Sequence, residues 1–217
     1  MAKRNFRRVR THSEREEREA AGFWKAIHLV KEIAESQEKI SLDIILKIHR
    51  VFFEDVMPEA AGRFRRAGED VKKLKCIEPP PGRLVLEYMY SFWREFDTRL
   101  ATIPRHSRAS SEKSRRKWLE IVFDLAVWTQ HQIGAIHPFV EGNGRMARLL
   151  TNLVLQRFKI KPSSVRYEGE QKAVYLDALC QADSQDDYEP LKELVLQGVR
   201  EEYRKEERWR RRISKRS

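Results

Sequence analysis

A short polar segment between two apolar runs holds most of the candidate chemistry of this chain. In residues 137–148, HPFVEGNGRMAR, a histidine precedes a carboxylate, two glycines around an asparagine, and two arginines. The glycine-flanked turn leads into a helical pattern, so unpaired backbone N–H groups are expected at the positive end of a helix. Such an end binds phosphate through its amides, and glycine lets the backbone approach the anion closely. We therefore expect Gly142, Asn143 and Gly144 to form a phosphate-binding turn.

Two arginines in the first turn of the same helix support this prediction. Arg145 and Arg148 are three residues apart, so they project to one side. Cations are disfavoured at a helix N-terminus, and two of them there indicate a bound anion. Guanidinium groups also match phosphate oxygens as forked donors. This argument favours a phosphate site over a turn whose arginines only pair with surface acids.

Glu141 and His137 would add a metal ion and a base to this phosphate site. A carboxylate beside a polyphosphate repels it unless a divalent cation lies between them, and Mg²⁺ commonly uses one carboxylate plus substrate phosphates. The simpler alternative for Glu141 is helix capping. His137 titrates near neutral pH and could accept a proton from an attacking hydroxyl, although a packed core histidine is the alternative. Together the residues predict a nucleotide site with a base beside it.

The elements that position this segment are predicted to be mainly helices. Apolar residues recur at helical spacing over most of the chain, and Ser41 is the expected N-cap of the second helix. Between residues 57 and 83 the pattern breaks. Short β-compatible segments on either side of a central Ala-Gly predict a small hairpin, and three consecutive prolines predict an extended link after it. The expected helices cover residues 17–35, 41–53, 84–100, about 117–136, 145–158, 169–182 and 189–207.

Composition excludes several classes of protein. With 217 residues, 41% of them hydrophobic, the chain is expected to form one domain with a single core. It contains no run of 18 apolar residues, and its first ten residues lack the apolar region of a secretory signal, so we expect no membrane span. Cys76 and Cys180 predict neither a disulfide framework nor a metal site, which favours a reducing cytosol.

The net charge of +11 is concentrated near both ends of the chain. Residues 1–16 are expected to form a basic N-terminal tail, and residues 201–217 a basic helix end or tail. Such runs are usually solvated, although a basic patch can also bind nucleic acid or an acidic partner. The sequence has no zinc-finger, RRM or helix-turn-helix signature, so solubilising tails are favoured over a nucleic-acid partner.

The segment HPFVEGNGRMAR resembles the signature of the Fic (Fic/Doc) family, HPFx(D/E)GNGRxxR, without any departure. Residues 40–53 resemble the helix before the family's target-docking flap, residues 61–81 resemble that flap, and residues 173–194 resemble the closing helices. The resemblance covers about residues 19–197. It implies a Fic-fold helical bundle with a short β-hairpin flap, in a Fic domain over 17–200 with its flap at about 60–82.

The resemblance also implies a reaction, the transfer of AMP from ATP to a Ser, Thr or Tyr hydroxyl of a target protein. His137 would be the general base, and Glu141 would hold Mg²⁺ between the α- and β-phosphates. Asn143 would contact the α-phosphate, within the Gly142–Gly144 cradle. Arg145 and Arg148 would hold the β- and γ-phosphates. Relatives that phosphorylate their targets carry Lys in place of the second Gly, so Gly144 favours nucleotidyl transfer.

The flap would dock an extended target segment by main-chain pairing, through Val71, Lys72 and Leu74. Many family members also carry an inhibitory helix, (S/T)xxxE(G/N), whose Glu pairs with the arginine at Arg148. Residues 13–18, SEREER, end in Arg instead, and residues 164–169, SVRYEG, fit the pattern in an unusual place. Inhibition by a separate antitoxin-like protein, or no inhibition, is therefore favoured.

Two alternatives to AMP transfer stay open on the sequence. The signature does not recognise the base, so a sister transferase could use UTP or CDP-choline. The other is a catalytically idle Fic-fold module that binds nucleic acid or a partner through its basic ends. The resemblance is compatible with a cytoplasmic protein or with one delivered into a host cytosol.

Overall fold

The computed structural model describes residues 12–36, 38–71, 73–104, 111–164 and 169–214, and in these ranges the chain is mainly helical. The predicted fold class is confirmed in this respect. Its elements in chain order are α1 (His12–Ser36), α2 (Leu42–Phe53), the 3₁₀ helix η1 (Gly82–Leu84), α3 (Val85–Thr102), α4 (Glu112–Ile136), α5 (Asn143–Arg157), α6 (Glu170–Gln185) and α7 (Glu189–Ser214).

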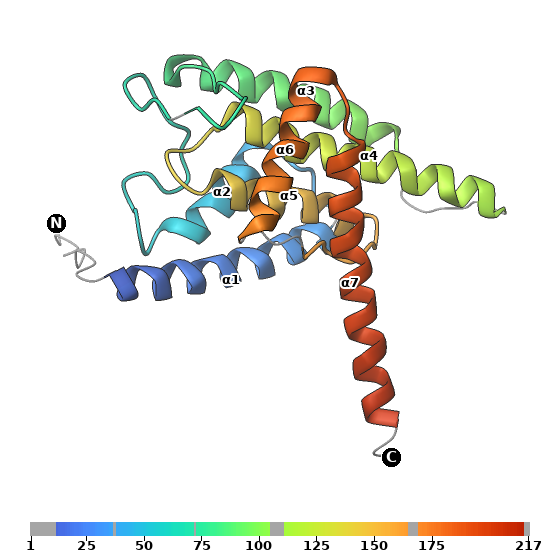
Figure 1. The fold of residues 1–217 in the computed structure, drawn as a ribbon. Coiled ribbons are helices and arrows are strands. Elements are labelled where there is room, and N and C mark those ends of the chain that lie inside the picture. The colour runs from blue at the N-terminus through green and yellow to red at the C-terminus, as the bar shows by residue number, and fades with distance from the viewer. Residues whose placement is uncertain (1–11, 37, 72, 105–110, 165–168, 215–217) are drawn as a thin grey trace.

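Helix α5, which follows the polar segment, lies at the centre of the bundle. It packs against α4 and α1, while α6 and α7 contact α4 (Figure 1). Five apolar residues that recur at helical spacing on α5 are all buried: Met146, Leu149, Leu150, Leu153 and Val154. Because α5 is anchored along its length, its first turn is held firmly against the rest of the core.

Several boundaries differ from the predicted ones. Helix α4 begins at Glu112, several residues early, because the side chain of Ser111 accepts a hydrogen bond from the backbone N–H of Ser114 and caps the helix. The predicted cap at Ser41 is confirmed by its bond from the N–H of Ile44. Trp24 of α1 is 63% exposed and lies outside the buried face of that helix.

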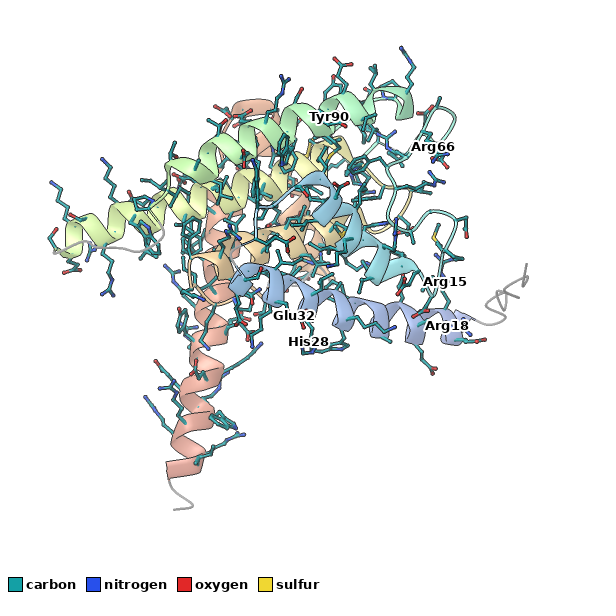
Figure 2. All side chains as sticks on the ribbon, turned by 180° about the vertical axis from the view of Figure 1, so that it is seen from behind. Arg15, Arg18, His28, Glu32, Arg66 and Tyr90 are labelled. Atoms are coloured by element: carbon teal, nitrogen blue, oxygen red, sulfur yellow. A yellow bond between two sulfur atoms is a disulfide. The ribbon has the colours of Figure 1, made fainter. Side chains whose placement is uncertain are left out.

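The two ends of the chain are more helical than predicted. Helix α1 begins at His12, inside the predicted basic tail, and its His28 and Glu32 side chains point away from the body (Figure 2). The second half of α7 runs clear of the other helices (Figure 1). Several basic residues of that half pair with acids one turn away, as in Arg210–Glu206 and Lys205–Glu202, which is typical of a solvated helix. None of the helices among the described residues is long and apolar enough to cross a membrane.

The predicted β-hairpin flap is not a regular hairpin. In the described part of residues 60–82, only Leu74 and Ile77 pair, through two backbone hydrogen bonds of 2.9 and 2.6 Å, and no strand forms. Continuing the ladder would pair residue 72 with Pro79, and proline has no N–H to donate. The prolines therefore limit the hairpin to one pair. Lys72 itself lies outside the described residues.

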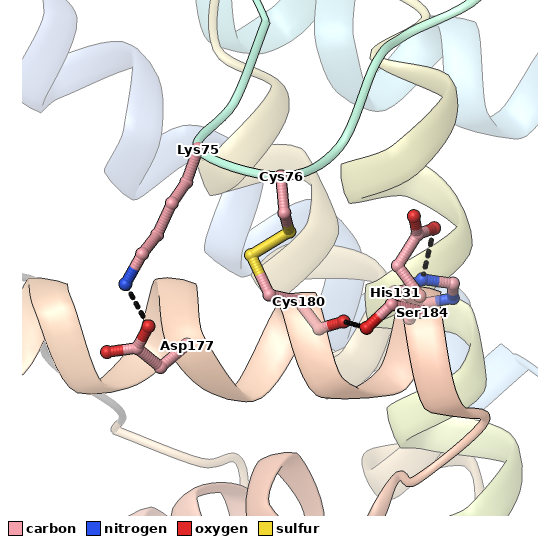
Figure 3. Close-up of a disulfide and its surroundings, with 7 residues drawn as sticks. Lys75, Cys76, His131, Asp177, Cys180 and Ser184 are labelled. Carbon is pink, nitrogen blue, oxygen red and sulfur yellow. Dashed lines mark hydrogen bonds and ion pairs between the residues drawn. A yellow bond between two sulfur atoms is a disulfide. The ribbon is translucent and has the colours of Figure 1, made fainter.

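The tip of this irregular flap is attached to α6 by a disulfide. Cys76 and Cys180 are bonded, with their Cα atoms 5.8 Å apart, and Lys75 pairs with Asp177 one turn away (Figure 3). The expectation of two unconnected cysteines is therefore wrong. The bond joins segments 104 residues apart in the sequence and fixes the flap over the second half of the chain.

Candidate active site

His137 lies at the end of α4 in a backbone conformation that residues other than glycine rarely adopt. Its φ of 48° and ψ of 59° place it in the left-handed region, and Pro138 prevents the helix from continuing. Such strain persists only where surrounding contacts determine it, and it is concentrated at functional sites. The turn directs the imidazole out of the helix and into a cleft.

The imidazole of His137 is held in its neutral form. Its Nδ1 lies 2.7 Å from the carbonyl oxygen of Gly134, which can only accept, so Nδ1 carries the hydrogen and Nε2 keeps a lone pair. Burial lowers the pKa of His137 below its usual value; the hydrogen bond to Gly134 opposes this, and the charge of Arg65 lowers the pKa further. The ring is thus available to accept a proton at neutral pH.

The expected phosphate turn begins α5. Gly142 has φ of 82°, and a Cβ there would lie 2.2 Å from the ring of Phe53, so only glycine fits. Asn143 is buried, and its amide both accepts from the N–H of Phe139, at 2.8 Å, and donates to its carbonyl, at 2.7 Å. The Asn143 side chain therefore folds the loop, a role that the sequence did not indicate. Its predicted contact with the α-phosphate stays a prediction.

Arg145 is already paired in the structure. Its guanidinium donates to Glu19 of α1 at 2.9 Å, lies 3.8 Å from Glu141, and covers the ring of Phe52. Arg145 therefore pairs with acids, as the alternative to a phosphate site expected, although it also borders the cleft. Glu19 lies 126 residues earlier in the chain, so no local pattern links it to this site.

The cleft has a volume of about 750 Å³, within the range of ligand sites. One wall is the flap, with Asp70, Val71 and Leu74, and another is α6. The predicted site residues that the structure describes all border this space. The cleft is lined by Asp70, Val71, Leu74, Gly134, His137, Val140, Glu141, Gly142, Asn143, Gly144, Arg145, Arg148, Lys172, Tyr175, Leu176 and Leu179.

The donors at the cleft fit a magnesium ion that is shared with a nucleotide. The carboxylate of Glu141 is half exposed and accepts from the N–H of Gly142 at 2.9 Å, beside the phosphate turn. The described ranges contain no group of three His, Cys, Asp or Glu residues that could hold a metal alone. Mg²⁺ commonly binds through one or two carboxylates together with substrate phosphates and waters, and Glu141 can supply that single carboxylate.

His49 of α2 is a buried residue of this site that the sequence analysis missed. Its ring stacks on Phe139 with 3.8 Å between centroids and 4° between planes. Nδ1 accepts from the N–H of Gly62 at 3.0 Å, so Nε2 carries the hydrogen and donates to the carbonyl of Glu141 at 3.2 Å. His49 thus connects the start of the flap to the Glu141 end of the loop. Its place within an apolar helical stripe gave no sign of this role.

Comparison with known proteins identifies the family. The sequence model of the Fic/DOC family matches residues 39–155, more than half of the chain. The chain belongs to the Fic/DOC family. The resemblance seen in the signature is confirmed.

Relatives extend the match beyond the signature. The chain is 29% identical over 174 residues to "Protein adenylyltransferase Fic" of Nematostella vectensis, covering 79% of this chain and 35% of that protein. It is 27% identical over 169 residues to "Protein adenylyltransferase fic-1" of Caenorhabditis elegans, covering 76% and 29%. The solved structure of Fic-1 (aa134 - 508) from C. elegans matches with a TM-score of 0.68 at 21% identity, over all of this chain and 56% of that one. This last likeness shows the Fic fold. The chain spans about a third of the length of these two curated relatives.

The Fic inhibitory pattern finds no clear counterpart in the part of the chain that the structure describes. Residues 13–18 belong to α1, where Glu17 is exposed, and the carboxylate that reaches the site is instead Glu19. In the segment 164–169, residues 165–168 lie outside the described residues. A separate inhibitory protein stays a prediction.

The Fic loop should lose stability in mild acid because of His49. Burial lowers the pKa of His49 from 6.5 to about 4, so the unfolded chain binds this proton before the folded protein does. The free energy of unfolding should therefore fall as pH decreases from 6.5 to about 4, by about 3 kcal/mol from this group, and level off below. Urea unfolding at several pH values measures the slope. A His49→Gln variant should have a smaller slope, and an unchanged slope would contradict the assignment.

The two Fic glycines should respond differently to alanine. Gly142→Ala should lower the free energy of unfolding by about 1–3 kcal/mol, because the methyl group meets Phe53 and φ is positive. Gly144 has open space at its Cβ position and is helical, so Gly144→Ala should keep or raise stability by up to about 1 kcal/mol. The methyl group of Gly144→Ala should also weaken ATP binding, because position 144 lies in the expected phosphate turn. Thermal unfolding and ATP titration measure both effects, and equal destabilisation by the two changes would refute the distinction.

Proposed function

We propose that this chain transfers AMP from ATP to a hydroxyl side chain of a target protein and releases pyrophosphate. One observation supports this most directly. A neutral imidazole, His137, borders the same cleft as a glycine-flanked helix N-terminus and two arginines. Its Nδ1 is engaged by Gly134, so Nε2 is the nitrogen that is left to take the proton of an attacking hydroxyl. The curated relatives named protein adenylyltransferases support the same reaction.

The phosphates of ATP bind at the first turn of α5. The backbone N–H groups of the Gly142–Gly144 turn lie at the positive end of that helix, where an anion is stabilised, and the N–H of Gly142 is bonded to the carboxylate of Glu141 in the structure. Arg148 and Arg145 hold the β- and γ-phosphates, with Arg145 kept over the Phe52 ring by Glu19. Glu141 would hold Mg²⁺, which when bound neutralises phosphate charge as pyrophosphate leaves.

The transfer step needs positioning more than covalent help from the protein. The target hydroxyl gives its proton to Nε2 of His137 while its oxygen bonds to the α-phosphorus. The bond from that phosphorus to the bridging oxygen breaks, and the electron pair leaves with pyrophosphate. The cationic groups of α5 stabilise the charge that develops on the leaving group.

The target segment lies along the flap wall of the cleft. Val71, Lys72 and Leu74 are the proposed docking residues, with Val71 and Leu74 bordering the cleft. Because Leu74 already pairs with Ile77, an added target strand would bond to the outer edge of this short segment. Disulfides persist in oxidising compartments, so the Cys76–Cys180 bond favours targets there over targets in a reducing cytosol.

Labelling with different donors tests this function. Purified protein with Mg²⁺ and a lysate is given ATP labelled on the α-phosphate, ATP labelled on the γ-phosphate, α-labelled UTP, or CDP-choline labelled on its choline. Label in a protein band from α-labelled ATP alone supports AMP transfer. Label from UTP or from CDP-choline would show that this compound, and not ATP, is the donor. Label from γ-labelled ATP would indicate phosphorylation. No label from any donor would favour an idle binding module. Mass spectrometry of the labelled band then identifies the target and the modified residue.

A further inference from the structure

The flap holds a buried arginine that touches the turn of the proposed base. The side chain of Arg65 is fully buried, and its Nε donates to the carbonyl of His137 at 2.6 Å. Its Nη2 donates to the carbonyls of Ile136, at 3.2 Å, and Pro80. The backbone N–H of Arg65 adds a bond to the carbonyl of Pro138 at 2.9 Å. One residue thus binds three successive carbonyls at the end of α4.

The burial of Arg65 costs folding free energy, so stability alone does not explain it. A buried charge is expensive unless it is paired and fully hydrogen-bonded. The Nη1 of Arg65 has no hydrogen-bond partner among the described residues, and its nearest carboxylate oxygen, of Asp70, is 3.9 Å away. Burial lowers the pKa of Arg65, yet a guanidinium stays charged. Such an incompletely satisfied buried group requires an explanation.

We propose that Arg65 is a positioning residue for AMP transfer: it holds the His137 turn in its left-handed conformation and joins that turn to the base of the flap. The inference rests on the proposed function. Carbonyls at the C-terminus of a helix carry partial negative charge, so a guanidinium is well suited to hold them. Because Arg65 also binds Pro80, the proposed base and the proposed docking wall move as one unit. A target hydroxyl bound along the flap therefore meets Nε2 at a fixed distance.

The charge of Arg65 also acts on the imidazole. Arg65 lowers the pKa of His137, whereas Glu141 in the same loop raises it. The other charged groups that border the cleft are Asp70 of the flap, Arg145 and Arg148 of α5, and Lys172 of α6. Removing the charge at position 65 while these remain should raise the pKa of His137.

Two variants and a matched control test the proposal. Arg65→Met removes the charge and all side-chain donors, while Arg65→Lys keeps the charge but loses the forked guanidinium donors. Arg63→Met is the control, because Arg63 lies in the same turn and pairs with Glu69 without any recorded bond to residues 136–138. Both Arg65 variants should lower the rate constant at saturating ATP by about 10- to 100-fold, with the KM for ATP within about twofold of the wild type. Arg63→Met should keep the wild-type rate. If Arg65→Met does not fold, Arg65→Lys alone decides this comparison.

A histidine titration by NMR tests the same contact without any transfer reaction. The His137 signal is assigned from its loss in His137→Gln, and its pKa should rise in Arg65→Met but not in Arg65→Lys or Arg63→Met. Wild-type protein that labels no target would contradict the proposed function, while this titration would still test Arg65. Wild-type rates in folded Arg65 variants, an equal rate loss in Arg63→Met, or an unchanged His137 pKa in Arg65→Met would overturn the inference.

Discussion

Replacing His137 with alanine is expected to lower the rate of AMP transfer by about 10²- to 10⁴-fold, with ATP affinity changed less than about twofold. The imidazole is the only group at the cleft whose recorded contacts, among the described residues, leave a neutral ring nitrogen for the target hydroxyl. The phosphate groups of ATP are held by α5 instead, so binding should survive. Transfer from α-labelled ATP and calorimetric titration of ATP measure the two quantities.

The matched control for this change is His28→Ala. His28 is an exposed histidine on the outer side of α1, and its removal should leave the rate unchanged. The pH profile gives a second check. Because burial lowers the pKa of His137, kcat/KM should hold down to a pH below 6.5 and then fall as the imidazole gains a proton. A rate that survives in His137→Ala would show that another group takes the proton.

The sequence predicted the parts of the site that depend on local chemistry. Residue type and spacing over a few residues are enough to predict the turn at Gly142, the helix that starts beside it and the buried face of α5. Roles that depend on distant partners could not be predicted. The carboxylate of Glu19 reaches Arg145 across 126 residues, and Arg65 reaches His137 across 72. Each of these residues looks like an ordinary surface charge in the sequence.

The flap shows why local patterns can also mislead. Short β-compatible segments on either side of a central Ala-Gly predicted a hairpin, but three prolines follow and remove the N–H groups that a ladder needs. What holds this segment in place is instead a set of long-range attachments. Arg65 fixes its base to the end of α4, and Cys76 fixes its tip to α6. A segment with almost no secondary structure of its own can therefore form a defined wall of the cleft.

The attachment at the tip should have the largest effect on stability. The variant Cys76→Ser/Cys180→Ser is expected to lower the free energy of unfolding by about 3–5 kcal/mol, because the bond closes a long loop of the unfolded chain. That is a large share of the about 5–15 kcal/mol that stabilises a typical domain. Urea unfolding without reductant measures the loss, and wild-type protein in excess reductant should unfold at the same urea concentration as the variant.

A neighbouring contact supplies the control for the disulfide. Lys75 and Asp177 join the same two segments through an ion pair whose side chains are about half exposed. Exposed pairs contribute little, so Asp177→Asn should change the free energy of unfolding by less than about 1 kcal/mol. A comparable loss in Asp177→Asn would mean that general contact between flap and α6, and not the covalent bond, stabilises the fold. Alkylation of both cysteines in native, unreduced protein would show that the bond is not formed at all. If the bond is present and its loss leaves the core intact, the flap should be the part that unfolds first, because Arg65 would then be its main remaining long-range attachment.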